Sequence, residues 1–437
     1  MENGVTENCH YSRRYKKPLR QCIKAITCVY AAISVITFGL YSAIPSGKIL
    51  FRGDDYTSPF YSADEGGSSD IVLDGNNDRL TADVSLFGSF RLCSAAEGNY
   101  NVNVTALGFI PVKTMQVSVI PQKYLIPDGR TVGIKLNTGG ITVVSVSEEA
   151  ETKSVRDAGI CSGDIILAVN DVGVSNADTL CQMIDQSGGS QVKLTVKRGE
   201  KITECYVTPV PDEKGGYRLG LWMKDGISGI GTLTYYDPEN STWGALGHGI
   251  TDEDTGEPAQ TQGGSMLSAG IVSIEKSQSG LPGELRGYVC ETGTEMGTVK
   301  ANNELGVYGS AQDSSLFSQQ ALKAASRDEV EEGEATILAS ISGGQPESYS
   351  VQIEKVYRNT LFPGKGMLIK VTDKRLLDEA GGIVQGMSGS PIEQDGKLVG
   401  AVTHVLVNDP TRGYGIFAQT MLETADILAT QGKSNAA

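Results

Sequence analysis

The sequence predicts a mainly β protein behind a single N-terminal membrane helix, and two observations support that prediction. Glycine accounts for 54 of the 437 residues, about one in eight, against roughly 7% in an average protein. Without a Gly-X-Y repeat, this excess is typical of tight turns between many short strands. The second observation is a run of residues near the N-terminus that contains neither charge nor proline.

The uncharged run covers residues 25–44 and is long enough, at about 30 Å of helix, to cross the hydrocarbon core of a bilayer. Basic residues crowd the segment before it, residues 1–24: Arg13, Arg14, Lys16, Lys17, Arg20 and Lys24. By the positive-inside rule, this head stays in the cytoplasm and the body lies outside it. A cleaved signal peptide is the alternative, but its apolar region usually spans roughly 7–15 residues. The sequence therefore favours an uncleaved anchor in a single-pass membrane protein.

Charge and cysteine usage exclude several classes of protein. The net charge is −15 although the head is basic, so the body is strongly acidic and repels nucleic acid. The eight cysteines show no CxxC spacing, which favours buried thiols over a zinc site or a disulfide framework. The sequence also lacks a P-loop, an HExxH motif and a dinucleotide-binding glycine fingerprint, so we expect neither a metal nor a cofactor.

The rest of the chain divides into segments that differ in composition and hydrophobic pattern. Residues 45–83 are rich in Gly, Ser and Asp and predict a flexible linker. Residues 84–121 alternate apolar and polar side chains and predict a small β unit. Residues 122–210 mix strands with one helical stretch, and residues 211–427 are again Gly-rich with a strand-turn texture. The last segment, residues 428–437, predicts a frayed tail.

The segment 122–210 resembles a PDZ domain, an α+β fold. Ala158-Gly159-Ile160 and Gly163-Asp164-Ile165-Ile166 match the turn and strand typical of PDZ domains in bacterial proteases. Thr131-Val132-Gly133-Ile134 resembles the carboxylate-binding loop, whose backbone N–H groups form a nest for a peptide C-terminus. The candidate peptide-binding residues are therefore Arg130, which adds a positive charge, and Val132, Gly133 and Ile134. Lys135 departs from the usual apolar residue, and a small β domain that packs without binding is the alternative.

The most informative motif is Gly386-Met387-Ser388-Gly389-Ser390-Pro391. A nucleophilic serine needs an exposed Oγ on a sharp turn whose backbone N–H groups point at the developing oxyanion. The motif's glycines, Gly386 and Gly389, allow such a turn around Ser388, with the amides of Gly386 and Ser388 as the oxyanion donors. The motif has the form of the Gly-x-Ser-Gly-Gly-Pro of trypsin-like serine peptidases, with Ser390 replacing one glycine.

Only three histidines are present, so few residues are candidates for the general base. His10 lies in the cytoplasmic head and is excluded. His248, in Gly247-His248-Gly249, precedes Ser388 in the chain, which matches the His-before-Ser order of trypsin-like barrels. His404 follows Ser388 in an alternating strand and is the alternative base. Otherwise it lines the wall of the substrate specificity pocket or is a packed side chain without a catalytic role. We favour His248.

The orienting carboxylate of the triad has three candidates. Asp373 follows a short strand, but it is also well placed to be the N-cap of a helix beginning at Lys374. Asp252 and Asp254 lie close to His248 in sequence, and a solvated acidic turn explains them better. Asp373 is therefore the predicted third member, with the helix cap left open.

Taken together, the anchor, the PDZ-like segment, the motif ALGHGITD and the motif IVQGMSGSPI followed by GAVTHVLVNDP resemble the stage IV sporulation protein B family of serine peptidases. The resemblance extends from about Leu86 to Glu423. It implies that the peptidase region is a trypsin-like double β-barrel. It also implies Ser388 as nucleophile, His248 as base and Asp373 as the aspartate of the triad.

The resemblance implies a biological role as well. Members of this family act during endospore formation, anchored in the forespore inner membrane with their bodies in the space between forespore and mother cell. There they cleave themselves and a regulatory membrane protein, which leads to activation of a late sigma factor. The expected partners are that substrate, the chain itself, peptide C-termini bound by the PDZ domain, and the membrane. A catalytically silent PDZ scaffold that recruits a partner across the same space is the alternative.

Overall fold

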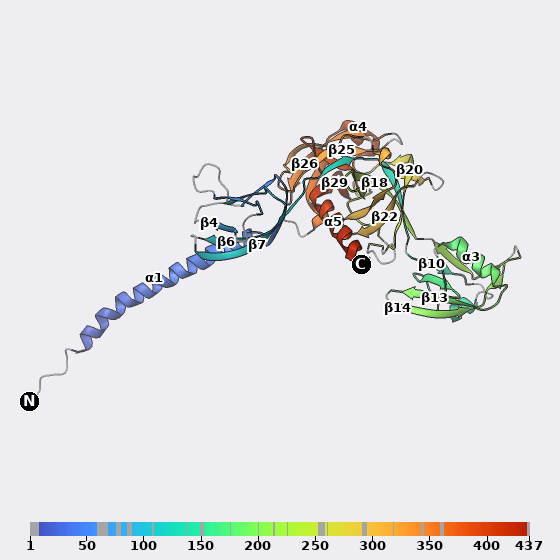
Figure 1. Cartoon of the computed structure of the whole chain (residues 1–437), viewed down its shortest axis with the longest axis horizontal. Helices are drawn as coiled ribbons and strands as arrows, with labels where there is room; N and C mark the ends of the chain where they lie inside the picture. The colour runs from blue at the N-terminus through green and yellow to red at the C-terminus, as the bar shows by residue number, and fades with distance from the viewer. Residues whose placement is uncertain are drawn as a thin grey trace, which may run out of the picture. The chain divides into compact units, whose positions relative to one another are not determined.

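The computed structural model (Figure 1) describes residues 8–434 with internal gaps. The gaps are residues 59–68, 76–79, 85–89, 107–108, 138, 149–152, 175, 200, 213–214, 225, 252–257, 260, 291–294, 318, 342–344 and 359–361. Asp252 and Asp254 therefore lie outside the described residues. The chain separates into two compact units, Met1–Gln122 and Lys123–Ala437.

The first unit consists of a long helix followed by short strands. Its elements are α1 (Asn8–Ala43), β1 (Gly47–Phe51), β2 (Asp55–Thr57), β3 (Ser69–Val72), β4 (Leu80–Val84), β5 (Phe90–Cys93), β6 (Gly98–Ala106) and β7 (Ile110–Ile120). Within α1, Gln21–Ala43 is long and apolar enough for a membrane span or a signal sequence. The strands form one sheet in the order β1-β7-β6-β4 and another in the order β2-β5-β3.

The prediction of a flexible linker over residues 45–83 is wrong for the part that the structure describes. Strands β1 to β4 fall within it, and β1 pairs in parallel with β7 along its whole length. Leu50, Phe51 and Leu73 are almost completely buried in the core of the unit. The apolar residues are few, but they sit at the strand positions that face the core, which a search for long alternating runs does not detect.

The PDZ-like fold begins later in the chain than predicted, at Ile141. Its elements are β10 (Ile141–Val146), α2 (Lys153–Asp157), β11 (Ile165–Val169), β12 (Val172–Gly173), α3 (Ala177–Gln186), β13 (Val192–Arg198), β14 (Lys201–Val207), β15 (Val210–Pro211), β16 (Tyr217–Arg218) and β17 (Leu221–Lys224). The sheet order is β14-β13-β11-β10-β17. Asn176 caps α3 by accepting the Thr179 N–H, and Leu180 and Ile184 bury one face of α3 in the core.

The strands of the peptidase region form two closed barrels. The first barrel contains β9 (Thr131–Leu136), β18 (Ile227–Asp237), β19 (Thr242–Ala245), β20 (Gly264–Glu275), β22 (Glu295–Asn303) and β23 (Gly306–Ala311), with β21 (Glu284–Val289) paired to β20. Their order β19-β23-β22-β20-β9-β18 closes through a β18–β19 pair. Closure removes the free strand edges, and a separate apolar core that includes Trp243 fills the interior.

The second barrel repeats this arrangement. It contains β25 (Gly333–Ala339), β26 (Glu347–Val356), β27 (Met367–Val371), β28 (Pro391–Gln394), β29 (Lys397–Leu406) and β30 (Asp409–Phe417). The order β29-β28-β25-β26-β27-β30 closes through a β29–β30 pair, and β8 (Tyr124–Pro127) and β24 (Leu322–Ala324) join the two barrels. Helices α4 (Lys374–Ala380) and α5 (Ala418–Ser434) and the short 3-10 helices Ser314–Leu316 and Pro363–Lys365 complete the peptidase region. The predicted double β-barrel is confirmed.

The PDZ-like fold is an insertion in the first barrel. Leu136 at the end of β9 and Ile227 at the start of β18 are direct partners in an antiparallel pair. The whole PDZ-like fold, drawn in green in Figure 1, lies between them in the sequence. The predicted boundaries of 122–210 and 211–427 are therefore corrected, because β8 and β9 belong to the peptidase and β15 to β17 to the PDZ-like fold. The predicted tail 428–437 continues α5 as far as Ser434.

Candidate active site

Ser388 lies on the loop that leads from α4 into β28, and this loop is fastened to the first barrel. The Thr232 N–H of β18 donates to the Ser388 carbonyl at 2.9 Å, and Thr234 Oγ1 donates to the Gly389 carbonyl at 2.8 Å. Gly389 has φ +98°, and a Cβ there would lie 2.0 Å from the Thr232 carbonyl oxygen. Only glycine fits this close approach between the barrels.

The backbone around Ser388 leaves two amides available. Thr232 Oγ1 donates to the Gly386 carbonyl at 2.8 Å, and this hydrogen bond holds the peptide group between Gly386 and Met387 in place. Within the part of the chain that the structure describes, the N–H groups of Gly386 and Ser388 donate to no other protein oxygen. Two preorganised, unpaired N–H groups next to a serine are what an oxyanion hole requires. This arrangement supports the predicted oxyanion donors.

His248 follows β19 on a turn made by two residues with positive φ, Leu246 (+69°) and Gly247 (+67°). A Cβ on Gly247 would lie 2.8 Å from Cγ2 of Thr403 in the second barrel, so the turn packs closely there. His248 Nδ1 is 2.8 Å from the carbonyl oxygen of Gly249. An N–H at Nδ1 donating to that oxygen leaves Nε2 as the proton acceptor. Burial lowers the pKa of His248, which favours the neutral base.

His404 lies beside His248, so the structure brings both candidate bases together. Their ring centroids are 5.1 Å apart, with an angle of 40° between the planes. Burial, and then the neighbouring His248 and Lys365, lower the pKa of His404 to about 4. Ser388 Oγ itself donates to the Thr403 carbonyl at 2.6 Å. Among the described contacts no hydrogen bond joins Ser388 Oγ to either ring, so Ser388 Oγ would have to leave the Thr403 carbonyl to reach a ring nitrogen.

Asp373 does not contact His248 in the described structure and takes the structural role that the sequence left open. Its carboxylate accepts the Arg375 N–H at 2.9 Å as the N-cap of α4 and also pairs with the Arg375 guanidinium. The Ser350 amide donates to the same carboxylate at 3.3 Å. These bonds, chiefly from the Arg375 side chain, lower the pKa of Asp373 to about 2. The geometry thus makes the Gly249 carbonyl, not Asp373, the partner of the His248 ring.

The predicted peptide-binding loop is a strand of the first barrel. β9 is hydrogen-bonded along one edge to β18 and along the other to β20, so its N–H groups form no free nest. Val132 and Ile134 are buried in the barrel core, and a Cβ on Gly133 would lie 2.5 Å from Val289. Arg130 pairs with Asp128 at 2.6 Å. The assignment of peptide binding to these residues is therefore wrong.

The structure shows a different groove on the PDZ-like fold. A cavity of about 350 Å³ lies between α3 and β17, lined by Leu180 and Ile184 on one side and by Leu221 on the other. Among the described strands β17 pairs with β10 alone, so it is an edge strand of its sheet. Leu219 and Gly220 lie directly before Leu221, the first residue of β17, and Gly220 has φ +69°. A glycine between two apolar residues directly before a strand was the sequence signal for this loop.

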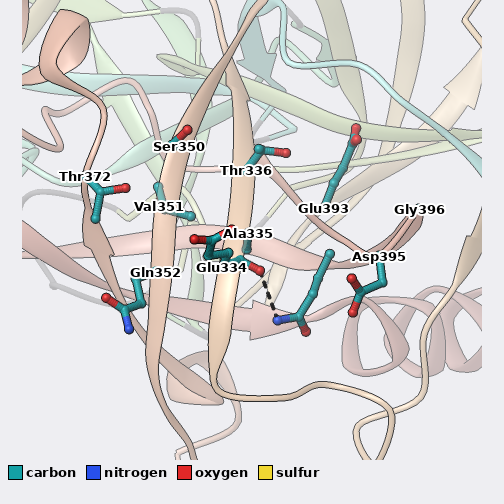
Figure 2. A pocket seen from close by; sticks show the side chains of 11 residues that line it. Glu334, Ala335, Thr336, Ser350, Val351, Gln352, Thr372, Glu393, Asp395 and Gly396 are labelled. Atoms are coloured by element: carbon teal, nitrogen blue, oxygen red, sulfur yellow. Dashed lines mark hydrogen bonds between the residues drawn. The ribbon is translucent and has the colours of Figure 1, made fainter.

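A polar cavity of about 470 Å³ lies on the second barrel between β25, β26 and β28. Figure 2 shows the carboxyl groups of Glu334, Glu393 and Asp395 around it, and burial raises the pKa of Glu393. Neither Ser388 nor His248 lines this cavity. Among the described residues no group of three or more His, Cys, Asp or Glu side chains is arranged to hold a metal ion.

Two closed β-barrels with a serine, a histidine and two free amides at their junction define a serine peptidase, here carrying an inserted PDZ domain. The family comparison agrees with that class: residues 215–422 match the family model for SpoIVB peptidase S55, and residues 156–198 match that of a PDZ domain. The resemblance found in the sequence is thereby confirmed. Strand β9 precedes the matched region, although it completes the first barrel.

Comparisons with individual proteins give weaker likenesses. The PDZ domain of an SdrC-like protein from Listeria monocytogenes is 22% identical over 20% of this chain and 90% of that chain, with a TM-score of 0.18. The active form of the Rv3671c protease from M. tuberculosis is 12% identical over 57% and 86% of the two chains, with a TM-score of 0.28. The HtrA-type protease AlgW with a decapeptide is 13% identical over 51% and 59%, with a TM-score of 0.31. No curated protein sequence gives a significant match.

Proposed function

We propose that this chain is a membrane-tethered serine endopeptidase in which Ser388 is the nucleophile and His248 the general base. The observation that supports this most directly is the junction of the barrels, where Thr232 fastens the Ser388 loop and the amides of Gly386 and Ser388 stay unpaired. The low pKa of His248 keeps its Nε2 ready to accept a proton at neutral pH. The Gly249 carbonyl holds the ring in the tautomer that the reaction needs.

The reaction follows from these positions. Ser388 Oγ leaves the Thr403 carbonyl, gives its proton to His248 and attacks the carbonyl carbon of the substrate. The two free amides stabilise the oxyanion of the tetrahedral intermediate. His248 then donates the proton to the leaving amine, which gives an acyl-enzyme. Finally, His248 activates a water molecule for deacylation.

The tether is proposed to be an uncleaved anchor with its N-terminus in the cytoplasm. Ile44, immediately after α1, is 1% exposed in the core of the first unit. Lys113 Nζ of β7 donates to the Ile44 carbonyl at 2.8 Å and contacts the Tyr41 carbonyl at the end of the helix. A positive group at a helix C-terminus is stabilising. The end of the apolar helix is therefore part of the folded unit, which supports retention of the helix.

The biological role proposed here is the one implied by the resemblance to the stage IV sporulation protein B family. In that role the peptidase cleaves itself and a regulatory membrane protein in the space between forespore and mother cell, and a late sigma factor becomes active. The PDZ groove between α3 and β17 would hold a peptide C-terminus and raise the local concentration of the attached segment near Ser388. The match to the peptidase S55 and PDZ family models supports this role.

The test of the peptidase uses full-length protein in detergent micelles, as wild type and as Ser388→Ala. Both are incubated with a fluorophosphonate probe and, in parallel, followed by intact mass. We expect the wild type to take the label and to cut itself, and Ser388→Ala to do neither while unfolding at the same temperature. A wild type that stays whole and unlabelled, also in liposomes, would support the silent scaffold instead.

The test of the groove is a pair of glycine substitutions. Gly220→Glu places a negative charge in the loop before β17, where a peptide carboxylate would sit, so we expect loss of peptide binding. Gly199→Glu is the matched control, because Gly199 also has positive φ (+58°) and has open space around it, but does not line the groove. Fluorescence anisotropy of a labelled peptide, with a free and with an amidated C-terminus, measures the difference. Equal binding by both variants would contradict the groove assignment.

A further inference from the structure

The β20–β21 hairpin of the first barrel reaches onto the loops of the second barrel that form the candidate active site. Ser277 donates from both its N–H and its Oγ to the Ala380 carbonyl at the end of α4, at 2.9 and 3.0 Å. Gly280 N–H donates to the Val407 carbonyl at 2.8 Å, and Ser279 Oγ donates to the Asn408 carbonyl at 2.8 Å. The hairpin therefore holds the segment before Ser388 and the turn between β29 and β30.

The closest of these contacts is at Gln385, the residue directly before the oxyanion donor Gly386. The Gln385 N–H donates to the Gly283 carbonyl at 2.8 Å, and the Leu285 N–H donates to the Gln385 carbonyl at 2.8 Å. Together they form a short parallel bridge between the hairpin and the active-site loop. The Leu285 side chain packs directly against Gly386, since a Cβ on that glycine would be 3.0 Å from Leu285 Cβ.

This bridge determines which way the Gly386 N–H points. In a trans peptide, the carbonyl of one residue and the N–H of the next point in opposite directions. The Gln385 carbonyl points to Leu285 in the hairpin, so the Gly386 N–H points away from the hairpin and is left unpaired. If the Leu285 bond were absent, this peptide could turn over and present a carbonyl oxygen where the oxyanion needs a donor. Gly386, with φ +98°, would tolerate such a rotation.

We propose that the β20–β21 hairpin positions the oxyanion hole, and that Leu285 is the positioning residue, acting through its backbone N–H on the Gln385–Gly386 peptide. The proposal rests on the proposed function in one respect, namely that Ser388 is the nucleophile. Leu285 touches no reacting atom. It orients the group that does, and a shift of the hairpin would therefore change the reaction rate of Ser388 without changing Ser388 itself.

Proline at position 285 tests this directly because it removes the donor and little else. Leu285 faces Ile274 in the hairpin, but its N–H goes to Gln385, so Leu285→Pro breaks no bond between β20 and β21. Leu285→Ala is the matched control, since it also loses the side chain but keeps the N–H. Full-length wild type, Ser388→Ala and these two variants are compared in detergent micelles with the fluorophosphonate probe, which gives the binding constant and the maximal labelling rate separately.

We expect the maximal labelling rate of Leu285→Pro to be about 100-fold lower than that of Leu285→Ala, which is the usual effect of losing one oxyanion donor. The binding constant for the probe and the unfolding temperature should be the same in the two variants. A role in stability alone would lower the unfolding temperature and leave the labelling rate of the folded fraction unchanged. Equal labelling rates in two folded variants would overturn the proposal.

If Leu285→Pro does not unfold cooperatively, the opposite bond of the bridge is removed instead. Gln385→Pro loses the donor to Gly283, and Gln385→Ala is its control because the Gln385 side chain is exposed. The proline variant should again react more slowly than its alanine partner, and equal rates would overturn the proposal. Failure of the wild type to label would instead refute Ser388 as nucleophile, and the role of the hairpin would fall with it.

Discussion

At the scale of single residues, the candidate site depends on how one imidazole is held. His248 is substantially buried, its Nδ1 is 2.8 Å from its neighbour's carbonyl oxygen, and its ring lies next to that of His404. A backbone carbonyl is a neutral acceptor, so it orients the ring but stabilises the imidazolium less than a carboxylate would. The two histidines lie so close together that only separate substitutions assign the base.

Substitution of each histidine by alanine should give different results. His248→Ala removes the proposed base, and we expect labelling by the fluorophosphonate to fall by about three orders of magnitude or more. His404→Ala removes a neighbouring ring that makes no hydrogen bond to Ser388, and we expect a change of less than about five-fold. Labelling rates on folded protein measure both. If His404→Ala is the inactive variant, the assignment of His248 as base is wrong.

The pH dependence of labelling should reflect the lowered pKa of His248. Only the neutral imidazole accepts a proton, so the rate rises with pH through the pKa of the folded protein. Because burial lowers that pKa below its ordinary value of 6.5, the midpoint of the rate profile should lie below pH 6.5. A rate profile from pH 4 to 8 measures this. A midpoint above 6.5 would show that the environment favours the charged form.

At the scale of the elements, helix α4 explains Asp373. The helix begins directly after this residue, its Oδ1 accepts the Arg375 N–H at 2.9 Å, and Gly381, with φ +75°, ends the helix. A cap of this kind contributes about 1 kcal/mol to stability. In this structure Asp373 and Arg375 therefore support the start of the helix that precedes the Ser388 loop.

Asp373→Asn separates a cap from a catalytic carboxylate. Asparagine caps helices about as well as aspartate, so the unfolding temperature should change little and the labelling rate should stay within a few-fold of the wild type. A carboxylate that orients a catalytic histidine would behave differently, since its replacement by asparagine costs about four orders of magnitude in rate. Thermal unfolding and labelling on the same samples decide between the two. A loss of that size would restore Asp373 to the triad.

At the scale of the whole molecule, the peptidase is interrupted and the PDZ fold is contained within it. β9 pairs with β18 and β20 and is needed to close the first barrel, although it precedes the PDZ fold in the sequence. Leu136 and Ile227 are direct strand partners, so the chain leaves the barrel for the PDZ fold and returns from it at adjacent positions. Such an arrangement lets a domain be inserted without disturbing the host strands.

Removal of the PDZ fold should therefore leave the barrel intact. We expect that replacing residues 137–226 by a two-residue Asn-Gly turn, which favours a tight hairpin between β9 and β18, gives a protein that unfolds cooperatively and labels at Ser388. A chain that begins at residue 141 loses β9 and should not fold, because the first barrel cannot close. Circular dichroism and labelling measure both. If the shorter chain folds and labels as well as the excised one, β9 is not part of the barrel core.

The sequence by itself determined the class of the protein and pointed to the candidate catalytic residues. The Gly386–Pro391 motif, the order of His248 and Ser388, the abundance of glycine and the uncharged run all depend on short-range patterns, which a chain displays directly. For the same reason the sequence left two roles open for Asp373, the N-cap of a helix and the carboxylate of the triad. A local pattern does not show which distant group a side chain meets.

The tertiary structure decided the long-range pairings. The same Thr-Val-Gly-Ile sequence can form a PDZ loop or a barrel strand, and only the pairing of this segment with β18 and β20 shows that it is a barrel strand. The groove between α3 and β17 and the hairpin bonds to Gln385 join residues far apart in sequence, and the contact of the Gly249 carbonyl with His248 depends on the backbone path. Backbone hydrogen-bonding groups are the same in every residue except proline, so the sequence does not show which of them pair. These features could therefore be found only in the folded structure.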